Sequence, residues 1–202
     1  MMRAKDMCLK KNRFLIFLIF FNFTLSNICV AQSALTKQAI NYIEGLNNFS
    51  GAFIQDDGES ISEGGIFVGS KRVRVEYYTP TKLLIILDKN KAMYYNYDLD
   101  EDEFFDPQDT SAGFFFQIFN NPDFFIDSEI ISKDNYLVLR KKGTNENGNY
   151  TIEIFFENNP IIIRKVKMFI NENYLGLSIY NHNHNEEFSE NKFKLINPNF
   201  FD

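Results

Sequence analysis

The feature that most constrains this chain is a series of short apolar or alternating segments separated by turns of only a few residues. Arg72 to Tyr77 alternates charged residues with Val73, Val75 and Tyr77, which is the period of a strand with one buried face. The apolar run Leu83 to Leu87 follows, and the three-residue turn Asp88-Lys89-Asn90 leads toward the next segment, Ala92 to Tyr97. A parallel crossover needs a dozen or more residues, so such neighbours pair antiparallel. The pattern therefore predicts an antiparallel meander.

The same pattern of short extended segments and Asn-, Gly- or Pro-bearing turns continues along the chain. Regularly spaced short strands of this kind are typical of a sandwich or a barrel-like sheet. The predicted strands are Phe49–Gln55, Ile61–Val68, Arg72–Tyr77, Leu83–Leu87, Ala92–Tyr97, Asp102–Phe105, Phe125–Ser132, Tyr136–Lys141, Tyr150–Phe156, Ile161–Ile170, Gly176–Asn181 and Phe188–Phe193.

Two segments have helical rather than extended character. Gln38 to Leu46 carries apolar residues at helical spacing and follows Thr36, a predicted N-cap. Thr110 to Asn120 has Thr110 or Ser111 as its cap, and Pro122 lies just beyond its end. The apolar residues of this second helix cover more than one face, so the helix needs apolar surroundings on several sides.

Two helices are too few to cover a sheet of ten or eleven strands completely. A curved sheet that does not close, with helices over its concave side, covers the apolar face of the strands and gives the second helix apolar surroundings. It also leaves an apolar space between the layers. We therefore expect a mainly β, α+β fold: an incomplete antiparallel β-barrel covered by a helical lid.

The first 31 residues are predicted to be a secretory signal peptide rather than part of this fold. Five basic residues precede an apolar run from Phe14 to Phe23, which is about half the length of a membrane span. Small residues then follow near Cys29. Cleavage is expected after Ala31, with cleavage after Ser33 as the alternative, and residues 32–202 are expected to form a single domain.

Lipid attachment to Cys29 is the alternative to a free mature chain, but the bulky Ile28 before it is unlike a lipoprotein signal. Removal of residues 1–31 takes five of the 21 basic residues and one of the 27 acidic residues, which leaves a formal net charge of −10. This charge argues against nucleic acid as a partner. Both cysteines, Cys8 and Cys29, precede the cut, so the mature chain, expected to be a monomer, depends on its core.

Motifs of catalysis or of cofactor binding are not found in the sequence, so an enzyme, a cofactor and a metal are not expected. His182 and His184 would share a strand face, but no third ligand accompanies them, and an exposed hairpin end is the favoured interpretation. The acidic run Asp98 to Glu103 opens like a calcium loop but lacks the glycine and the final glutamate that such a loop needs. It is interpreted as a solvated hairpin tip.

An ordered set of short motifs gives the chain a family resemblance. The set comprises Leu46–Gln55, Ser62–Phe67, Arg72–Tyr77, Pro80, Leu83–Ile86, Asp88–Lys91, Tyr95–Asp98, the helix from Thr110, Pro160 and Leu175–Asn181. In this order, and after a signal peptide, the set resembles the periplasmic outer-membrane lipoprotein carrier family, LolA. The resemblance spans nearly the whole mature chain.

The resemblance implies a periplasmic chaperone that binds the acyl chains of lipoproteins in its cavity and carries them from the inner to the outer membrane. It implies an inner-membrane ABC transporter complex as donor and an outer-membrane lipoprotein acceptor as recipient. The alternatives are that acceptor itself, if Cys29 is lipidated, or an envelope protein-binding or sensor module with the same fold. Family members place an arginine and a proline before the third strand, and that arginine contacts the lid; here Lys71 or Arg72 would serve.

The expected lining of the acyl-chain cavity follows from the parity of each strand and from the aromatic residues of the second helix. A shift of one residue would turn a strand's whole set outward. The predicted lining residues are Phe67, Val73, Val75, Tyr77, Leu84, Ile86, Met93, Tyr95, Phe115, Phe116 and Phe119.

Overall fold

The computed structural model describes residues 34–145 and 148–200. The chain divides into two units, Met1–Lys37 and Gln38–Asp202, and the second contains every strand named below. The predicted signal peptide, Cys29 and both candidate cleavage sites lie outside the described residues.

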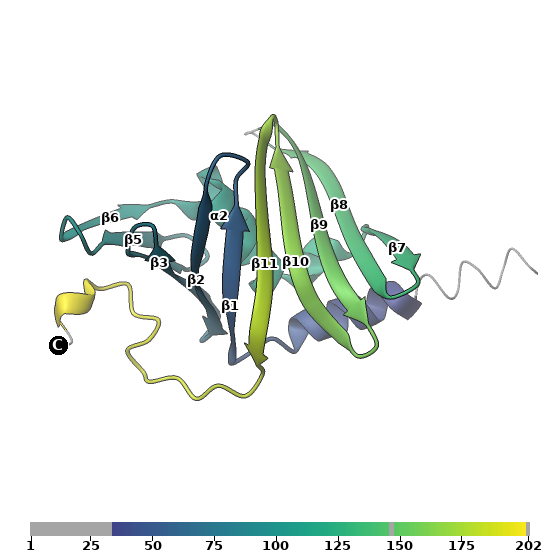
Figure 1. Cartoon of the computed structure of the whole chain (residues 1–202), viewed down its shortest axis with the longest axis horizontal. Helices are drawn as coiled ribbons and strands as arrows, with labels where there is room; N and C mark the ends of the chain where they lie inside the picture. The colour runs from purple at the N-terminus through teal and green to yellow at the C-terminus, as the bar shows by residue number, and fades with distance from the viewer. Residues whose placement is uncertain (1–33, 146–147, 201–202) are drawn as a thin grey trace, which may run out of the picture. The chain divides into compact units, whose positions relative to one another are not determined.

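Within the described part of the chain, eleven antiparallel strands form one sheet in the order β6-β5-β4-β3-β2-β1-β11-β10-β9-β8-β7 (Figure 1). Pairing of β1 with β11 joins the two halves of the meander, and β6 and β7 are the two free edges of the sheet, which therefore does not close. The predicted incomplete antiparallel sheet is confirmed. The strands are β1 (Phe49–Asp56), β2 (Ile61–Gly69), β3 (Arg72–Thr79), β4 (Leu83–Leu87), β5 (Ala92–Asn96), β6 (Glu101–Phe105), β7 (Glu129–Lys133), β8 (Tyr136–Asn145), β9 (Gly148–Asn158), β10 (Ile161–Ile170) and β11 (Asn173–Asn183).

The register of the central strands decides which side chains share a face. Val75 of β3 lies opposite Ile66 of β2 and Ile85 of β4, so these three side chains project from one face of the sheet. Leu84 lies opposite Tyr95 and therefore projects from the other face. Below, the inner face is the one that carries Val75, and the outer face is the one that carries Leu84.

The helix α2 (Ser111–Asn120) lies against β3 and β4 on the inner face. The hydroxyl oxygen of Thr110 accepts a hydrogen bond from the backbone N–H of Ala112, at 3.2 Å, which confirms Thr110 as the cap. Short 3₁₀ turns flank the helix: η1 (Pro107–Asp109) and η2 (Pro122–Phe125). A Cβ on Gly113 would lie 2.5 Å from the carbonyl oxygen of Pro107, so glycine permits this close approach of η1 to α2.

Three predictions concern the ends of elements; two of them are wrong and the third agrees with the structure. Residues 34–44 are helical, so Thr36 lies inside the first helix and does not cap it. The predicted strand Phe125–Ser132 begins only at Glu129, because Pro122 starts the turn η2 and buries Phe125 there. Asp98–Glu103 does form the β5–β6 hairpin tip and the start of β6, as predicted.

The C-terminal segment, residues 184–200, crosses the outer face without forming a strand, and the prediction of a strand at Phe188–Phe193 is wrong. We call this segment the strap; Figure 1 shows it in yellow, running from the lower end of β11 past the lower ends of β1 and β2 toward the side of β5 and β6, with α2 behind the sheet. Guanidinium groups bind its carbonyls: Arg72 donates to the oxygen of Phe193 at 3.1 Å, and Arg74 to that of Lys192 at 2.9 Å. These two carbonyls are thus satisfied by side chains rather than by a strand ladder, while the backbone N–H of Glu186 donates to the carbonyl oxygen of Asn48 at 2.9 Å. It ends in the 3₁₀ turn η3 (Pro198–Phe200).

Candidate functional site

An apolar cavity of about 80 Å³ lies between α2 and the inner face of the sheet. Apart from the hydroxyls of Ser111 and Tyr77, its wall is built from apolar side chains. Its lining residues are Ile66, Val75, Tyr77, Ile85, Leu87, Ser111, Ala112, Phe115, Leu175 and Leu177. A space of this kind offers contact to an apolar chain.

Phe115 is the largest side chain that α2 contributes to the cavity wall, beside Ser111 and Ala112. The residue is 9% exposed, and apolar residues of β2, β3, β4 and β11 line the same cavity. Phe114, Phe116, Ile118 and Phe119 of the same helix are buried as well, so α2 has apolar contacts on several sides as its composition predicts. Phe115 therefore occupies space that an apolar ligand of the cavity would need.

Tyr77 provides the one side-chain hydrogen bond at the cavity wall among the residues that the structure describes. Its hydroxyl donates to the side-chain oxygen of Gln55 at 2.8 Å, and its ring meets the ring of Phe53 edge to face at 5.3 Å. Burial raises the pKa of Tyr77 to about 12, so the phenol is neutral throughout the physiological range. A Cβ on Gly64 would lie 2.6 Å from the ring of Phe53, so the glycine makes room for this ring.

A second, larger cleft of about 690 Å³ lies on the other side of the same helix. Phe116, Phe119 and Pro122 form its apolar wall. Lysines, acids and amides form the rest: Glu44, Asn47, Lys71, Asp88, Lys89, Gln117, Asn120 and Asn121. This cleft is amphipathic, in contrast to the cavity beneath Phe115.

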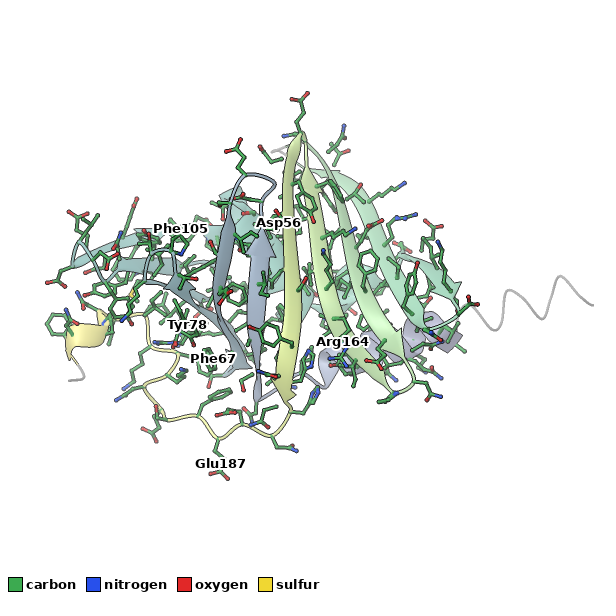
Figure 2. All side chains as sticks on the ribbon, in the orientation of Figure 1. Asp56, Phe67, Tyr78, Phe105, Arg164 and Glu187 are labelled. Carbon is green, nitrogen blue, oxygen red and sulfur yellow. The ribbon has the colours of Figure 1, made fainter. Side chains whose placement is uncertain are left out.

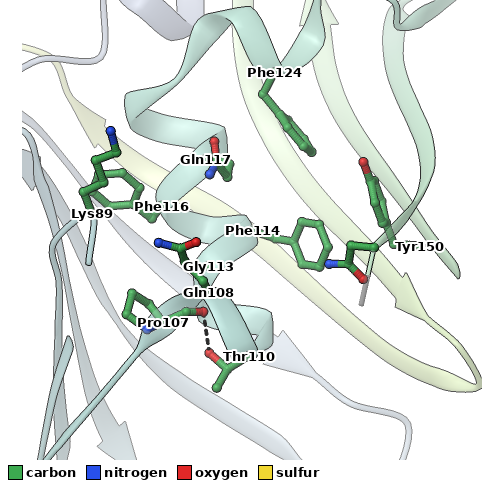
Figure 3. Close-up of a pocket in the computed structure, with 11 residues that line it drawn as sticks. Lys89, Pro107, Gln108, Thr110, Gly113, Phe114, Phe116, Gln117, Phe124 and Tyr150 are labelled. Atoms are coloured by element: carbon green, nitrogen blue, oxygen red, sulfur yellow. Dashed lines mark hydrogen bonds between the residues drawn. The ribbon is translucent and has the colours of Figure 1, made fainter. Parts of the chain in front are cut away.

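A third pocket, of about 270 Å³, lies beside the first turn of α2 (Figure 3). The ring of Phe114 lies 4.7 Å from that of Tyr150, and the ring of Phe124 stacks on Tyr150 at 6.2 Å, so three aromatic rings form one wall. Figure 3 shows Lys89 and Phe116 on the opposite side of the helix from these rings. The pocket thus touches the amphipathic cleft, with which it shares Lys89, Phe116 and Gln117.

Four of the predicted lining residues line the cavity or share the inner face with it, and two others line the neighbouring cleft. Val75, Tyr77 and Phe115 line the cavity itself. Val73, fully buried, is on the same face of β3. Phe116 and Phe119 line the amphipathic cleft instead of the cavity.

The other five predicted lining residues lie on the outer face, and their assignment to the cavity is corrected. Leu84, Ile86, Met93 and Tyr95 form a buried cluster against Leu195 of the strap. Phe67 also faces the strap, where its ring lies 6.2 Å from that of Phe188 (Figure 2). In β4 the physical reason is that both faces are apolar and covered, so alternation alone cannot assign the inner side. Ile85 and Leu87 are the residues of β4 that line the cavity.

The two basic residues proposed to contact the lid have different environments. Lys71 lines the amphipathic cleft next to α2. Arg72 instead binds the carboxylate of Asp88, at 2.7 Å, and the strap, so the structure gives it a role on the outer face. Ser70 and Lys71 both have positive φ, 52° and 58°, as a two-residue hairpin turn requires.

Sequence reasoning missed the contribution of β11 to the cavity. Leu175 and Leu177 line it because β11 pairs with β1, a contact between segments far apart in the chain. The alternation of Leu175 and Leu177 marks a buried face, but only the pairing shows which residues that face meets.

The two histidines lie at the end of β11 and beyond it, not in a hairpin. Their rings lie 5.7 and 5.4 Å from the ring of Phe49 and 6.2 Å from each other, so they pack as aromatic groups. Burial, followed by the charge of Arg164, lowers the pKa of His182. Among the described residues no three His, Cys, Asp or Glu side chains are placed to hold a metal ion.

Comparison with known proteins adds a family and a fold. The model of the family described as outer membrane lipoprotein carrier protein LolA matches residues 44–196. An uncharacterised protein, RP864, of Rickettsia prowazekii (strain Madrid E) is 27% identical over 166 residues, which cover 80% of this chain and 76% of that protein. The crystal structure of an uncharacterised conserved protein from Thermus thermophilus superposes with a TM-score of 0.54 at 11% identity, covering 80% of this chain and 93% of that one. Within residues 34–145 and 148–200, no helix is long and apolar enough to cross a membrane.

Proposed function

The chain belongs to the LolA family of outer membrane lipoprotein carriers, and from that premise we propose that it carries lipoproteins across a bacterial periplasm. In this proposal residues 32–202 are the mature carrier. It receives acylated proteins from an inner-membrane ABC transporter complex and passes them to an outer-membrane acceptor. Its role is binding rather than catalysis.

The observation that carries the proposal is the apolar cavity beneath Phe115. Each acyl methylene transferred out of water contributes about 0.8 kcal/mol, so two or three chains of about 16 carbons sum to tens of kcal/mol. Non-covalent affinities saturate near about 18–21 kcal/mol, so a carrier that must also release its cargo shields such chains with loosely matched walls. The aliphatic and aromatic lining formed by Val75, Tyr77, Leu87 and Phe115 suits that requirement.

The size of the cavity makes movement of α2 part of the proposal. Ligand pockets in proteins measure about 300–1,000 Å³, whereas this cavity is about 80 Å³. Outward displacement of α2 would withdraw Phe115 and enlarge it. The helix is joined to the sheet through the turns η1 and η2, which begin at Pro107 and Pro122 and could serve as hinges. We further propose Lys71, which lines the cleft next to α2, as the basic contact to this lid.

Depletion of the protein in its own bacterium tests the proposal. Lipoproteins of the outer membrane should accumulate in the inner membrane when membranes are separated by density, and lipoprotein should co-purify with the tagged carrier from the periplasm. An unchanged distribution of lipoproteins would refute the carrier function. Palmitate labelling of Cys29 would instead assign the chain as the lipidated acceptor.

A further inference from the structure

The helix α2 lies between the apolar cavity and the amphipathic cleft, and residues that are adjacent in the chain line the two different spaces. Phe115 enters the apolar cavity, and the next residue, Phe116, lines the large cleft. The same step occurs at the end of β4, where Leu87 lines the cavity and Asp88 and Lys89 line the cleft. Consecutive Cα atoms are about 3.8 Å apart, so the boundary between the two spaces is one residue wide at both places, and the polar end of an acyl chain in the enlarged cavity has only this boundary to pass to reach the cleft.

The polar wall of the cleft has the donors and acceptors that a peptide main chain needs. Gln117, Asn120 and Asn121 present side-chain amides there, next to Phe116. The Nδ2 of Asn120 is buried and has no hydrogen-bond partner among the described residues. Native proteins seldom leave such a donor unsatisfied, and a carbonyl of a bound peptide would accept its hydrogen bond once α2 moves.

The charges at the cleft favour an acidic peptide, although the mature chain as a whole is acidic. Lys71 and Lys89 face two acids, and one of these, Asp88, is already neutralised by Arg72 at 2.7 Å. The remaining acid is Glu44, so the two lysines leave the cleft with a local excess of positive charge.

We propose that this cleft binds the first residues of the cargo polypeptide, next to its acylated end, and that Lys71 and Lys89 favour acidic side chains in that stretch. The inference rests on the proposed carrier function and adds a site for the peptide part of the cargo. The acyl chains occupy the cavity under α2, and the attached peptide follows the cleft past Phe116 and Gln117.

Two dipalmitoylated cysteinyl peptides test the inference: one continues with Ser-Asp-Asp-Asn and the other with Ser-Lys-Lys-Asn, and both carry a C-terminal dansyl group. The readout is the ratio of their dissociation constants, measured by fluorescence anisotropy at low salt. Effects on the acyl chains or on the lid are common to both peptides and cancel in this ratio. Exposed ion pairs of this kind are individually weak, so the wild type should prefer the acidic peptide by about fivefold, and the preference should fall in 0.5 M salt because salt screens exposed charges.

The double variant Lys71→Gly, Lys89→Ser should reduce the preference to less than about twofold, because both charges are lost. Glycine suits the left-handed position of Lys71 and keeps the turn folded. The matched control is Lys82→Ser, which removes an exposed lysine at the opposite end of β4, away from the cleft, and should retain the preference.

Equal affinity of the wild type for the two peptides, or a preference that survives in the double variant, would overturn the inference. Binding of dansyl-labelled undecanoic acid, measured in parallel, separates this result from failure of the carrier function. If the fatty acid binds while the peptides are not distinguished, only the peptide site is wrong. If the fatty acid does not bind, the carrier function fails and the peptide site with it. If the binding of dipalmitoyl phosphatidylglycerol depends on the two lysines while the binding of the peptides does not, the cleft is a phosphate site and the inference is overturned.

Discussion

The most direct consequence of the structure is that removal of the Phe115 ring should strengthen acyl-chain binding while it weakens the fold. The ring fills space that an acyl chain would occupy, so binding has to displace it. Burial of a phenylalanine side chain contributes about 1.5–3 kcal/mol, and at 9% exposure nearly all of this applies to the closed state. If a displaced ring recovers about half of that contact against the bound lipid, Phe115→Ala gains about 0.8–1.5 kcal/mol, a four- to twelvefold lower dissociation constant.

The assay is a titration of the purified mature chain with dansyl-labelled undecanoic acid, beside urea unfolding followed by circular dichroism. Phe115→Ala should lower the free energy of unfolding by about 3 kcal/mol, the low end for such truncations, because the ring already borders a void. Phe114→Ala is the matched control: its ring is similarly buried but packs on Tyr150, outside the cavity, so stability should fall without a gain in affinity. Weaker or unchanged fatty-acid binding by Phe115→Ala would show that the ring is ordinary core and that the lid reasoning is wrong.

Three further substitutions test other parts of the structure. Burial opposes ionisation of Glu76, but the hydrogen bond from Lys192 and the neighbouring positive charges lower the pKa of Glu76 below the ordinary 4.5. The stabilisation that the ionised Glu76 provides is therefore present above pH 4.5 and is lost as the pH falls through this lowered pKa. Glu76→Gln should flatten this acid dependence in urea titrations, and an unchanged profile would contradict it. Leu195→Asp should free the strap and raise fluorescence of an apolar dye at pH 7, because it places a charge on a buried apolar cluster; equal dye binding would count against the strap's role. Gly64→Ala should cost at least about 2 kcal/mol in urea unfolding, since the added Cβ meets the carbonyl of Glu76, and wild-type stability would show that the backbone yields there.

Local patterns were enough to predict most of the elements. The alternation of Arg72 to Tyr77 gives β3 with its buried face assigned correctly, because one face of that segment is charged. Thr110 and Pro122 mark the limits of α2, because a cap and a proline act within one turn of helix. Where such local asymmetry exists, as at Val75, Tyr77 and Phe115, the structure places the side chains at the cavity, and their role in acyl-chain binding stays a prediction.

Prediction failed where the residues on the two faces of a strand are equally apolar, or where an apolar segment does not join the sheet. Leu83 to Leu87 is apolar at every position, and β4 is covered by α2 on one face and by Leu195 of the strap on the other. Phe188–Phe193 has the composition of a strand, but it crosses the face of the sheet, and the carbonyls of Lys192 and Phe193 are bound by arginine side chains rather than by a neighbouring strand.

The sequence by itself determined the antiparallel meander, the capped lid helix and a family whose motifs run in order along the chain, since each depends on neighbours a few residues apart. The tertiary structure alone decided which residues of β4 face the cavity, that β11 completes its wall through β1, and that Phe115 and Phe116 serve two different spaces. The physical reason is that hydrophobic burial is non-directional. The spacing of apolar residues along the sequence therefore indicates which side chains are buried, but not which element buries them.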